Sequence, residues 1–317
     1  MRILSAQDVS AVTNFYNQMR NASEGGLCLR PIRRETAQWW FFGDNRATFV
    51  AEEEGQIVGL VSGVYLPDRK TGYLSYLSVA PEHRGQGIAT SLMNELEAAL
   101  FRFEGCEKLD AVFYNPVNLP WYVAEDGGHY HPCVPGVDVS SGLFGFLSHR
   151  GWTEFVRQNA YYRPLAGYVD PPHMAEVRAR LLTEGIEVTL YDPEKHHGLA
   201  ELFDNINNPG WKAQVMANTD KPIVVAVDHH ADGLVVAYTG PLSISEGRGN
   251  FCGIGTIKEY RGRGIGKVVF CEMCSRHAQN GGEFMSLYTG TTNPARNIYE
   301  AAGFSVVRSF ANMRKIK

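Results

Sequence analysis

The chain has 317 residues, of which 44% are hydrophobic and 20% are charged, and its net charge is −4. This composition is typical of a globular protein with room for about two domains, and it disfavours disorder. The small acidic excess disfavours nucleic acid as a partner. We find neither an apolar run long enough to cross a membrane nor a signal peptide, so we expect a cytoplasmic protein with no membrane partner.

The first half of the sequence predicts a helix, three successive strands and then a long helix. Asp8 is a typical N-cap for the first helix, and apolar residues recur every four positions from Ile88 to Leu100, which is the spacing of one helix face. The expected elements are a helix over residues 8–20, strands over 47–52, 57–65 and 73–79, a helix over 87–103, a strand over 109–114, a helix over 142–148 and a strand over 154–162.

The second half predicts a similar series after a linker helix. Pro171-Pro172 precedes a helical pattern over residues 174–183. The elements expected next are a strand over 186–190, a helix over 197–206, strands over 223–227, 234–238 and 250–256, a helix over 264–279, a strand over 283–288, a helix over 295–302 and a strand over 305–312. Several strands before each long helix predict an α/β protein with a mixed sheet rather than a simple Rossmann alternation.

Two segments recur along the chain. Arg84-Gly85-Gln86-Gly87-Ile88-Ala89 and Arg261-Gly262-Arg263-Gly264-Ile265-Gly266 each follow a strand and begin a helix, and helices ending in Gly151-Trp152 and Gly303-Phe304 follow later. The first pair is 177 positions apart and the second 152, so the first half holds 25 extra residues. We therefore predict two copies of one domain, over residues 1–165 and 186–317, joined by a linker helix over 166–185, with an inserted loop near 115–141 in the first copy.

The two glycine loops suit a bound di-anion. Glycine lets the backbone come close to a ligand, and a helix N-terminus presents unpaired N–H groups and positive potential. Arg84 and Arg261 could add charge or only cap each loop from outside. The P-loop pattern fails because position 261 is Arg and position 268 is Val, and the dinucleotide pattern fails because Lys267 and Thr90 stand where glycine is needed.

These loops resemble the acyl-CoA signature of the GNAT superfamily of N-acetyltransferases, and the likeness covers nearly the whole chain as two tandem GNAT-like acyl-CoA N-acyltransferase domains. The resemblance implies acetyl-CoA as the acyl donor, with its pyrophosphate on the loop amides and its pantetheine arm along the preceding strand. The donor-binding residues that it implies are Leu77-Ser78-Val79, Arg84-Gly85-Gln86-Gly87-Ile88-Ala89-Thr90, Ile254-Gly255-Thr256, Arg261-Gly262-Arg263-Gly264-Ile265-Gly266-Lys267 and Asn293.

A second motif of the family places a tyrosine on a short helix that ends in Gly-Phe. Tyr299 occupies this position in the second copy, where the resemblance implies that its hydroxyl protonates the CoA sulfur, whereas the first copy has Leu147. Asn293 stands one residue later than the family pattern has its asparagine. We therefore expect the C-terminal copy to carry most of the catalysis, unless Tyr122 or Tyr130 of the insert replaces the missing hydroxyl.

Other polar clusters leave alternatives open. Glu246, Glu259 and Asp228 are candidates for a general base or are solvated turn residues, and a water could do this work. The insert, with Trp121, Tyr122, Glu125, Asp126, His129, Tyr130 and His131, either walls the acceptor pocket of the first copy or packs as filling against the second.

The cysteines are expected to be reduced, and no metal is expected. Cys271, Cys274 and His277 lie in an apolar helical pattern and lack a second ligand pair with zinc-finger spacing. His129, His131 and Cys133 lie in a loop rich in glycine and proline.

The leading hypothesis is an acetyl-CoA-dependent N-acetyltransferase that moves the acetyl group directly to an amine. Its acceptor would be a small molecule or a peptide, and the chain would be a monomer or a homodimer. One alternative keeps both copies and only one active site. Another is a non-catalytic acyl-CoA-binding or interaction protein.

Overall fold

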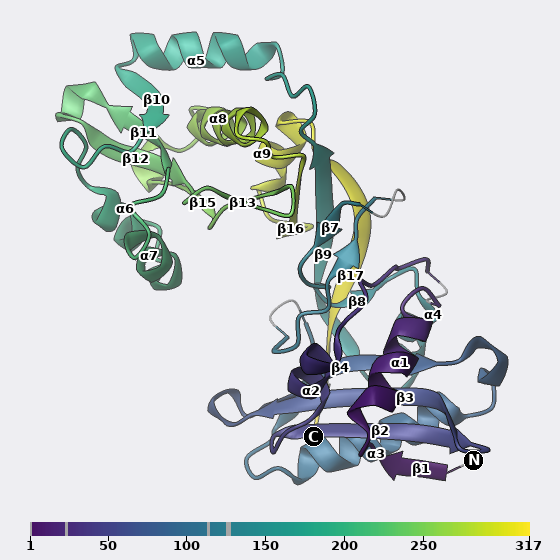
Figure 1. The fold of residues 1–317 in the computed structure, drawn as a ribbon. Coiled ribbons are helices and arrows are strands. Elements are labelled where there is room, and N and C mark those ends of the chain that lie inside the picture. The colour runs from purple at the N-terminus through teal and green to yellow at the C-terminus, as the bar shows by residue number, and fades with distance from the viewer. Residues whose placement is uncertain (1, 23–24, 113–114, 125–127) are drawn as a thin grey trace. The chain divides into compact units, whose positions relative to one another are not determined.

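A computed structural model describes residues 2–22, 25–112, 115–124 and 128–317 of the chain. The chain forms two compact units, which we call unit 1 (Met1–Ala160 with Arg308–Lys317) and unit 2 (Tyr161–Val307). Each unit combines helices with a mixed sheet, as predicted (Figure 1). The sequence placed residues 308–317 in the second domain, but the structure places them in unit 1 because the last strand of the chain pairs there.

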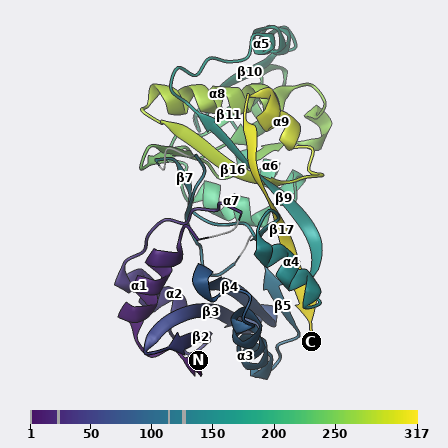
Figure 2. The same cartoon turned by 90° about the vertical axis from the view of Figure 1, so that its right-hand side faces the viewer.

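Unit 1 is built around a sheet with the strand order β1-β2-β3-β4-β5-β17, in which β17 (Ser305–Ile316) is the last strand of the chain. All these pairs are antiparallel except β4 with β5. Helices α1 and α2 cover one face of this sheet and α3 covers the other (Figures 1 and 2). The elements are β1 (Arg2–Ser5), α1 (Val9–Met19), α2 (Arg34–Phe41), β2 (Arg46–Glu53), β3 (Gln56–Leu66), β4 (Thr71–Val79), α3 (Ile88–Arg102), β5 (Lys108–Ala111), β6 (Trp121–Tyr122), β7 (Tyr130–His131), β8 (Val137–Asp138), α4 (Gly142–His149) and β9 (Thr153–Pro164).

The predicted signals explain the helices of unit 1. The Asp8 carboxylate accepts hydrogen bonds from the backbone N–H groups of Ser10 at 2.7 Å and Ala11 at 3.2 Å, which caps α1. Along α3 the apolar face at four-residue spacing is buried, with Leu92 and Leu100 fully inaccessible to solvent. This face packs against β2 and β3 and forms the core of the unit.

Unit 2 contains a sheet with the order β10-β11-β12-β15 and a parallel pair of β14 with β16. Helices α6 and α7 lie on one face of the first sheet and α8 on the other (Figure 1). The elements are α5 (His173–Thr183), β10 (Ile186–Leu190), α6 (Leu199–Asn205), α7 (Pro209–Met216), β11 (Val224–Asp228), β12 (Leu234–Thr239), β13 (Ser243–Ser245), β14 (Arg248–Asn250), β15 (Ile254–Thr256), α8 (Ile265–Gln279), β16 (Phe284–Gly290), α9 (Arg296–Ala301) and β17 (Ser305–Ile316).

One predicted strand is interrupted. The sequence indicates a single strand over residues 250–256, but the structure ends β14 at Asn250 and starts β15 at Ile254. Gly253 between them has a φ of +70°, and a Cβ there would come within 2.6 Å of the Trp211 ring. The contact with α7, which the sequence did not predict, explains why the chain bends at a glycine.

The last strand of the chain completes the sheet of unit 1. Met313 of β17 lies opposite Ala111 of β5 in antiparallel register. The Arg314 guanidinium donates two hydrogen bonds to the Asp110 carboxylate, at 2.6 and 2.8 Å, in the fork geometry that makes such pairs strong. The final residues therefore hold unit 1 together by both backbone and side-chain contacts. Among the described residues, no helix is long and apolar enough to cross a bilayer.

Candidate functional site

In unit 1 the strands β4 and β5 separate part-way along their length. They pair in parallel only up to Tyr73 opposite Asp110, although β4 continues to Val79. A bulge in the β3–β4 ladder leaves Ser75 without a direct partner, because Gly63 pairs with Leu74 and Ser62 pairs with Tyr76. A bulge bends its strand and re-aims the groups beside it. The separated strand ends open one side of β4 to a ligand.

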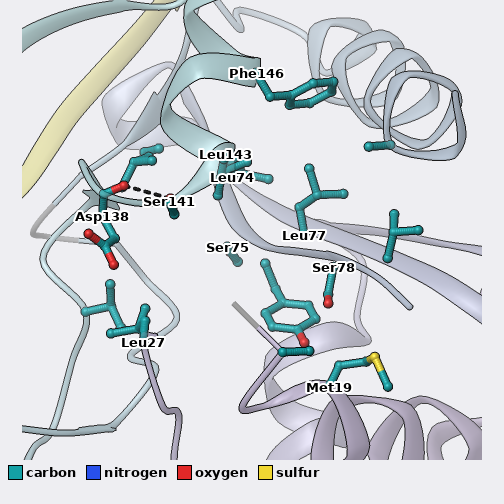
Figure 3. A pocket seen from close by; sticks show the side chains of 18 of the residues that line it. Met19, Leu27, Leu74, Ser75, Leu77, Ser78, Asp138, Ser141, Leu143 and Phe146 are labelled. Carbon is teal, nitrogen blue, oxygen red and sulfur yellow. Dashed lines mark hydrogen bonds between the residues drawn. The ribbon is translucent and has the colours of Figure 1, made fainter. Parts of the chain in front are cut away.

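A cavity of about 480 Å³ lies at this opening (Figure 3). All of the residues that line it belong to unit 1. Most of the donor-binding residues expected in the first copy meet here, namely Leu77, Ser78, Val79, Arg84, Gly85, Gly87, Ile88, Ala89 and Thr90. Gln86 does not line the cavity, and its side-chain amide is 3.4 Å from the Glu82 carbonyl oxygen.

The first loop, residues 84–89, has the geometry of an anion site. Gly85 and Gly87 have φ angles of +73° and +79°, and a Cβ at either position would meet no atom within 4 Å. Gly87 begins α3, a helix of 15 residues, and the N–H groups of a first helical turn have no partner within the helix. The loop therefore offers an open surface with unpaired N–H groups and the positive end of a helix dipole.

The two loop arginines brace the turn. The Arg84 side chain donates through Nε to the Val79 carbonyl at 3.1 Å and through Nη2 to the carbonyl of Ala22. Arg261 donates through Nε to the Thr256 carbonyl at 3.0 Å. Of the two roles that the sequence left open, these hydrogen bonds favour capping of the loop from outside.

The second loop, residues 261–266, has the same backbone conformation, but helix α5 lies against it. Gly262 and Gly264 both have φ of +81°, but a Cβ on Gly264 would lie 3.0 Å from the Val177 side chain of α5. The Arg180 guanidinium of α5 donates to the Arg263 carbonyl at 2.6 Å. The Glu184 carboxylate accepts from Arg263, and the hydrogen bonds of these two arginines lower its pKa. A helix and a carboxylate therefore occupy the surroundings of this loop.

In unit 2, Tyr299 packs among aromatic rings and Asn293 stabilises a turn. Tyr299 is 7% exposed, its ring lies 5.0 Å from that of Phe270 and 5.8 Å from that of Tyr161, and burial raises its pKa to about 12. The Asn293 side chain accepts a hydrogen bond from Ala295 N–H at 2.9 Å and so stabilises the turn before α9. The matching residue of unit 1, Leu147, is fully buried. The catalytic role expected for Tyr299 stays a prediction.

The candidate bases of unit 2 are exposed or already paired. The Asp228 carboxylate accepts hydrogen bonds from Tyr260 at 2.6 Å and from His230 N–H at 2.8 Å. Burial would raise its pKa, but these hydrogen bonds outweigh burial and the pKa is lowered. Glu259 accepts from Asn205 at 3.1 Å, and Glu246 is exposed.

Cys271, Cys274 and His277, which the sequence analysis considered as metal ligands, are buried in α8. Burial raises the pKa of the Cys271 and Cys274 thiols inside α8, and it lowers the pKa of His277 to about 4. In the part of the chain that the structure describes, no group of three His, Cys, Asp or Glu side chains could hold a metal ion.

The insert contributes to the cavity of unit 1. Its lining residues are Asn115, Val117, Leu119, Val134, Gly136, Val137, Asp138 and Ser141. Of the two alternatives left by the sequence, this geometry favours a wall of the first copy's pocket. Tyr122 and Tyr130 do not line the cavity. The ring centroid of Trp121 lies 5.5 Å from that of Phe310. Glu125 and Asp126, and part of the strand expected over 109–114, lie outside the described residues.

Sequence reasoning missed several polar residues of the cavity. The Ser75 hydroxyl donates to the Asn115 side chain at 3.3 Å, and Asn115 in turn donates to the Leu74 carbonyl at 2.7 Å. Tyr76 lines the same wall, and burial raises its pKa. The alternation of β4 predicted a strand, but only the bulge and the loss of pairing with β5 show which residues face a ligand.

Comparison with known proteins decides the family. The sequence model of the acetyltransferase (GNAT) family matches residues 14–124 and 186–304. The chain belongs to this family. The two matched regions confirm the predicted tandem organisation, and the mixed sheets confirm the predicted fold class. GNAT membership supports an enzyme that transfers an acyl group.

Three solved structures illustrate the likeness of the GNAT fold. A GCN5-related glucosamine N-acetyltransferase region of a fungal multi-domain GH3 beta-N-acetylglucosaminidase has a TM-score of 0.67 at 19% identity, and the match covers 99% of this chain but 38% of that protein. A GCN5-related N-acetyltransferase from Sphaerobacter thermophilus has a TM-score of 0.64 at 16% identity, covering 99% and 95%. A tandem GNAT protein from the clavulanic acid biosynthesis pathway has a TM-score of 0.58 at 16% identity, covering 99% and 97%.

Proposed function

We propose that this GNAT protein is an acetyl-CoA-dependent N-acetyltransferase whose donor binds in unit 1. The observation that carries this proposal is the cavity between the separated ends of β4 and β5, which meets the open first loop at the start of α3. The loop amides would bind the pyrophosphate. The edge of β4 at Leu77-Ser78-Val79, beyond the last residue that pairs with β5, would pair with the amide groups of the pantetheine arm, as a peptide adds to a sheet edge.

The second loop, in unit 2, has less space for a pyrophosphate than the first loop. Val177 and Arg180 of α5 contact the second loop, and Ile298 of α9 lies 3.1 Å from where a Cβ on Gly266 would be. A pyrophosphate at Gly264 would lie close to α5 and would meet the Glu184 carboxylate beside Arg263. We therefore favour the alternative with one active copy, and we place it in unit 1 rather than in the C-terminal copy.

The proposed reaction is a direct transfer. The neutral amine nitrogen attacks the thioester carbonyl carbon, a C–N bond forms and the C–S bond breaks, and one proton passes from the nitrogen to the departing sulfur. The products are an N-acetyl amine and the free thiol. Positioning of the two reactants supplies much of the acceleration in such a transfer.

The side chains of unit 1 limit which group can donate the proton to the departing CoA sulfur. Leu147 has no hydroxyl at the position where the second copy has Tyr299. Tyr76, at the wall of the cavity, carries its phenol proton at neutral pH as any tyrosine does, and burial raises its pKa further. We infer that Tyr76 or a water molecule, rather than the residue at the family's tyrosine position, returns the proton to the sulfur.

Thiol release tests this proposal. The protein is incubated with acetyl-CoA and a panel of primary amines and amine-bearing peptides, and free CoA thiol and N-acetyl product are quantified together. We expect equal amounts of thiol and N-acetyl product with at least one acceptor. Tight acetyl-CoA binding without product would instead support the non-catalytic acyl-CoA-binding alternative. The cytoplasmic location expected from the sequence stays a prediction.

A further inference from the structure

The cavity of unit 1 has a donor end and a second end that the repeated motifs do not provide. The donor end comprises β4, the first loop and the start of α3. The other end is lined by residues that follow α1 and by the insert, and the apolar members of this set are Leu27, Leu29, Val117, Leu119, Val134 and Val137. Figure 3 shows Leu27 and Ser141 near Asp138, with the Ser141 hydroxyl donating to the Asp138 carbonyl at 2.7 Å, and Ser75 further along the wall.

This second end combines an apolar wall with the polar side chains of Ser75, Asn115, Asp138 and Ser141. Leu29, Val117, Leu119 and Val137 are all less than 10% exposed, so their side chains form a packed wall rather than a solvated rim. The second copy lacks the 25 extra residues that supply most of this wall. A wall that is specific to one copy and that lines the same cavity as the first loop is suited to selecting the acceptor.

The described charged side chains at this end, Asp138 and Arg20, are already paired. The Asp138 carboxylate accepts hydrogen bonds from the Arg308 guanidinium and from the Ser140 hydroxyl at 2.7 Å. The Arg20 guanidinium donates to the Leu29 carbonyl at 3.3 Å and to Asn21 at 3.1 Å. Within the described part of the chain, a second positive charge on the acceptor would find no uncommitted carboxylate at the cavity wall. Burying such a charge without a partner is costly.

We propose that the acceptor is a monoamine carried on an apolar aliphatic or aromatic body, an inference that rests on the function proposed above. Apolar surroundings disfavour the charged form of an amine, so they promote the neutral nitrogen that attacks the thioester. A polyamine keeps further ammonium groups. An amino sugar brings several hydroxyls, and the polar side chains of Ser75, Asn115 and Ser141 already bond to protein groups. An apolar body instead gains from leaving water.

A competition among three primary amines tests this inference. We would measure kcat/KM for 2-phenylethylamine, spermidine and glucosamine at saturating acetyl-CoA, after calorimetry has established that acetyl-CoA binds. We expect 2-phenylethylamine to be preferred by at least about tenfold. Equal or better use of spermidine or glucosamine overturns the acceptor inference and leaves the proposed function intact. Failure to bind acetyl-CoA at all overturns the proposed function itself.

A matched pair of variants locates the preference in the wall. Leu27→Asp adds a carboxylate at a half-buried cavity position, whereas Leu27→Asn has the same shape without the charge. In the aspartate variant we expect the ratio of kcat/KM for 2-phenylethylamine to kcat/KM for spermidine to fall by about tenfold. In the asparagine variant we expect this ratio to stay within about twofold of wild type. An equal change in both variants contradicts selection by charge at this wall. If neither variant folds, as judged by circular dichroism, the wild-type competition decides.

Discussion

At the scale of single residues, the two glycine loops have similar sequences and backbones but different neighbours. Gly85 and Gly262 share a left-handed backbone with open space around the missing Cβ. Two positions further, a Cβ on Gly87 would meet no atom within 4 Å, whereas a Cβ on Gly264 would lie 3.0 Å from Val177. The sequence predicted the glycines correctly as loop residues, but it could not show which loop is covered, because the covering helix lies about 80 residues earlier in the chain.

Tyr299 gives a direct test at this scale. Tyr299→Phe removes one hydroxyl from a buried ring, and our account places the reaction in unit 1, so kcat should stay within about twofold of wild type. Steady-state kinetics with acetyl-CoA and an accepted amine measures it. A fall of about hundredfold, the effect of losing a general acid, would instead support the role that the sequence motif implies and move the active site to the C-terminal copy.

At the scale of elements, hydrophobic spacing predicted the long helices and the central strands to within a few residues. The regular burial of α3 and the Asp8 cap of α1 explain this success. The short strands of the insert and the break before β15 were not predicted, because tertiary contacts such as that of Trp211 with Gly253 determine them. The pairing of β17 with β5 was missed for the same reason, since no local pattern reports a partner about 200 residues away.

The contacts of β17 predict a pH-dependent stability. Glu97 of α3 is buried and accepts hydrogen bonds from Lys315 at 2.7 Å, Trp152 at 3.0 Å and Arg150 at 3.0 Å. Burial alone would raise the Glu97 pKa, but these donors together lower it from 4.5. A lowered pKa in the folded state contributes stability above about pH 4.5 that is lost as the pH falls through the folded value.

Glu97→Gln should therefore destabilise the protein by about 1–3 kcal/mol at pH 7, because the amide cannot replace the charge-assisted hydrogen bonds. The difference from wild type should shrink as the pH falls through the lowered pKa that Glu97 has in the folded state. Denaturant unfolding at several pH values measures this. Glu95→Gln on the same helix is the matched control, since Glu95 is exposed and should show no such change. A pH-independent difference would show that the charge of Glu97 is not its contribution.

At the scale of the whole molecule, one chain holds two domains of the same family with different surroundings at corresponding loops. The first copy has an open loop, a split between β4 and β5 and an insert that lines the cavity. The second copy has a loop in contact with α5 and a tyrosine packed among aromatic rings. The sequence revealed the duplication and predicted the donor, whereas the open loop of the first copy and the apolar wall of its cavity required the tertiary structure.

Isothermal titration of acetyl-CoA against Gly85→Asp and Gly262→Asp tests the central claim most directly. Both glycines have positive φ and no atom within 4 Å of an added Cβ, so the two substitutions carry the same local strain. Each would place a carboxylate at the corresponding helix N-terminus, where it repels a pyrophosphate. Our account predicts one acetyl-CoA per wild-type chain, a loss of affinity of at least about tenfold in Gly85→Asp and unchanged binding in Gly262→Asp. Unchanged binding in Gly85→Asp with loss in Gly262→Asp would contradict it.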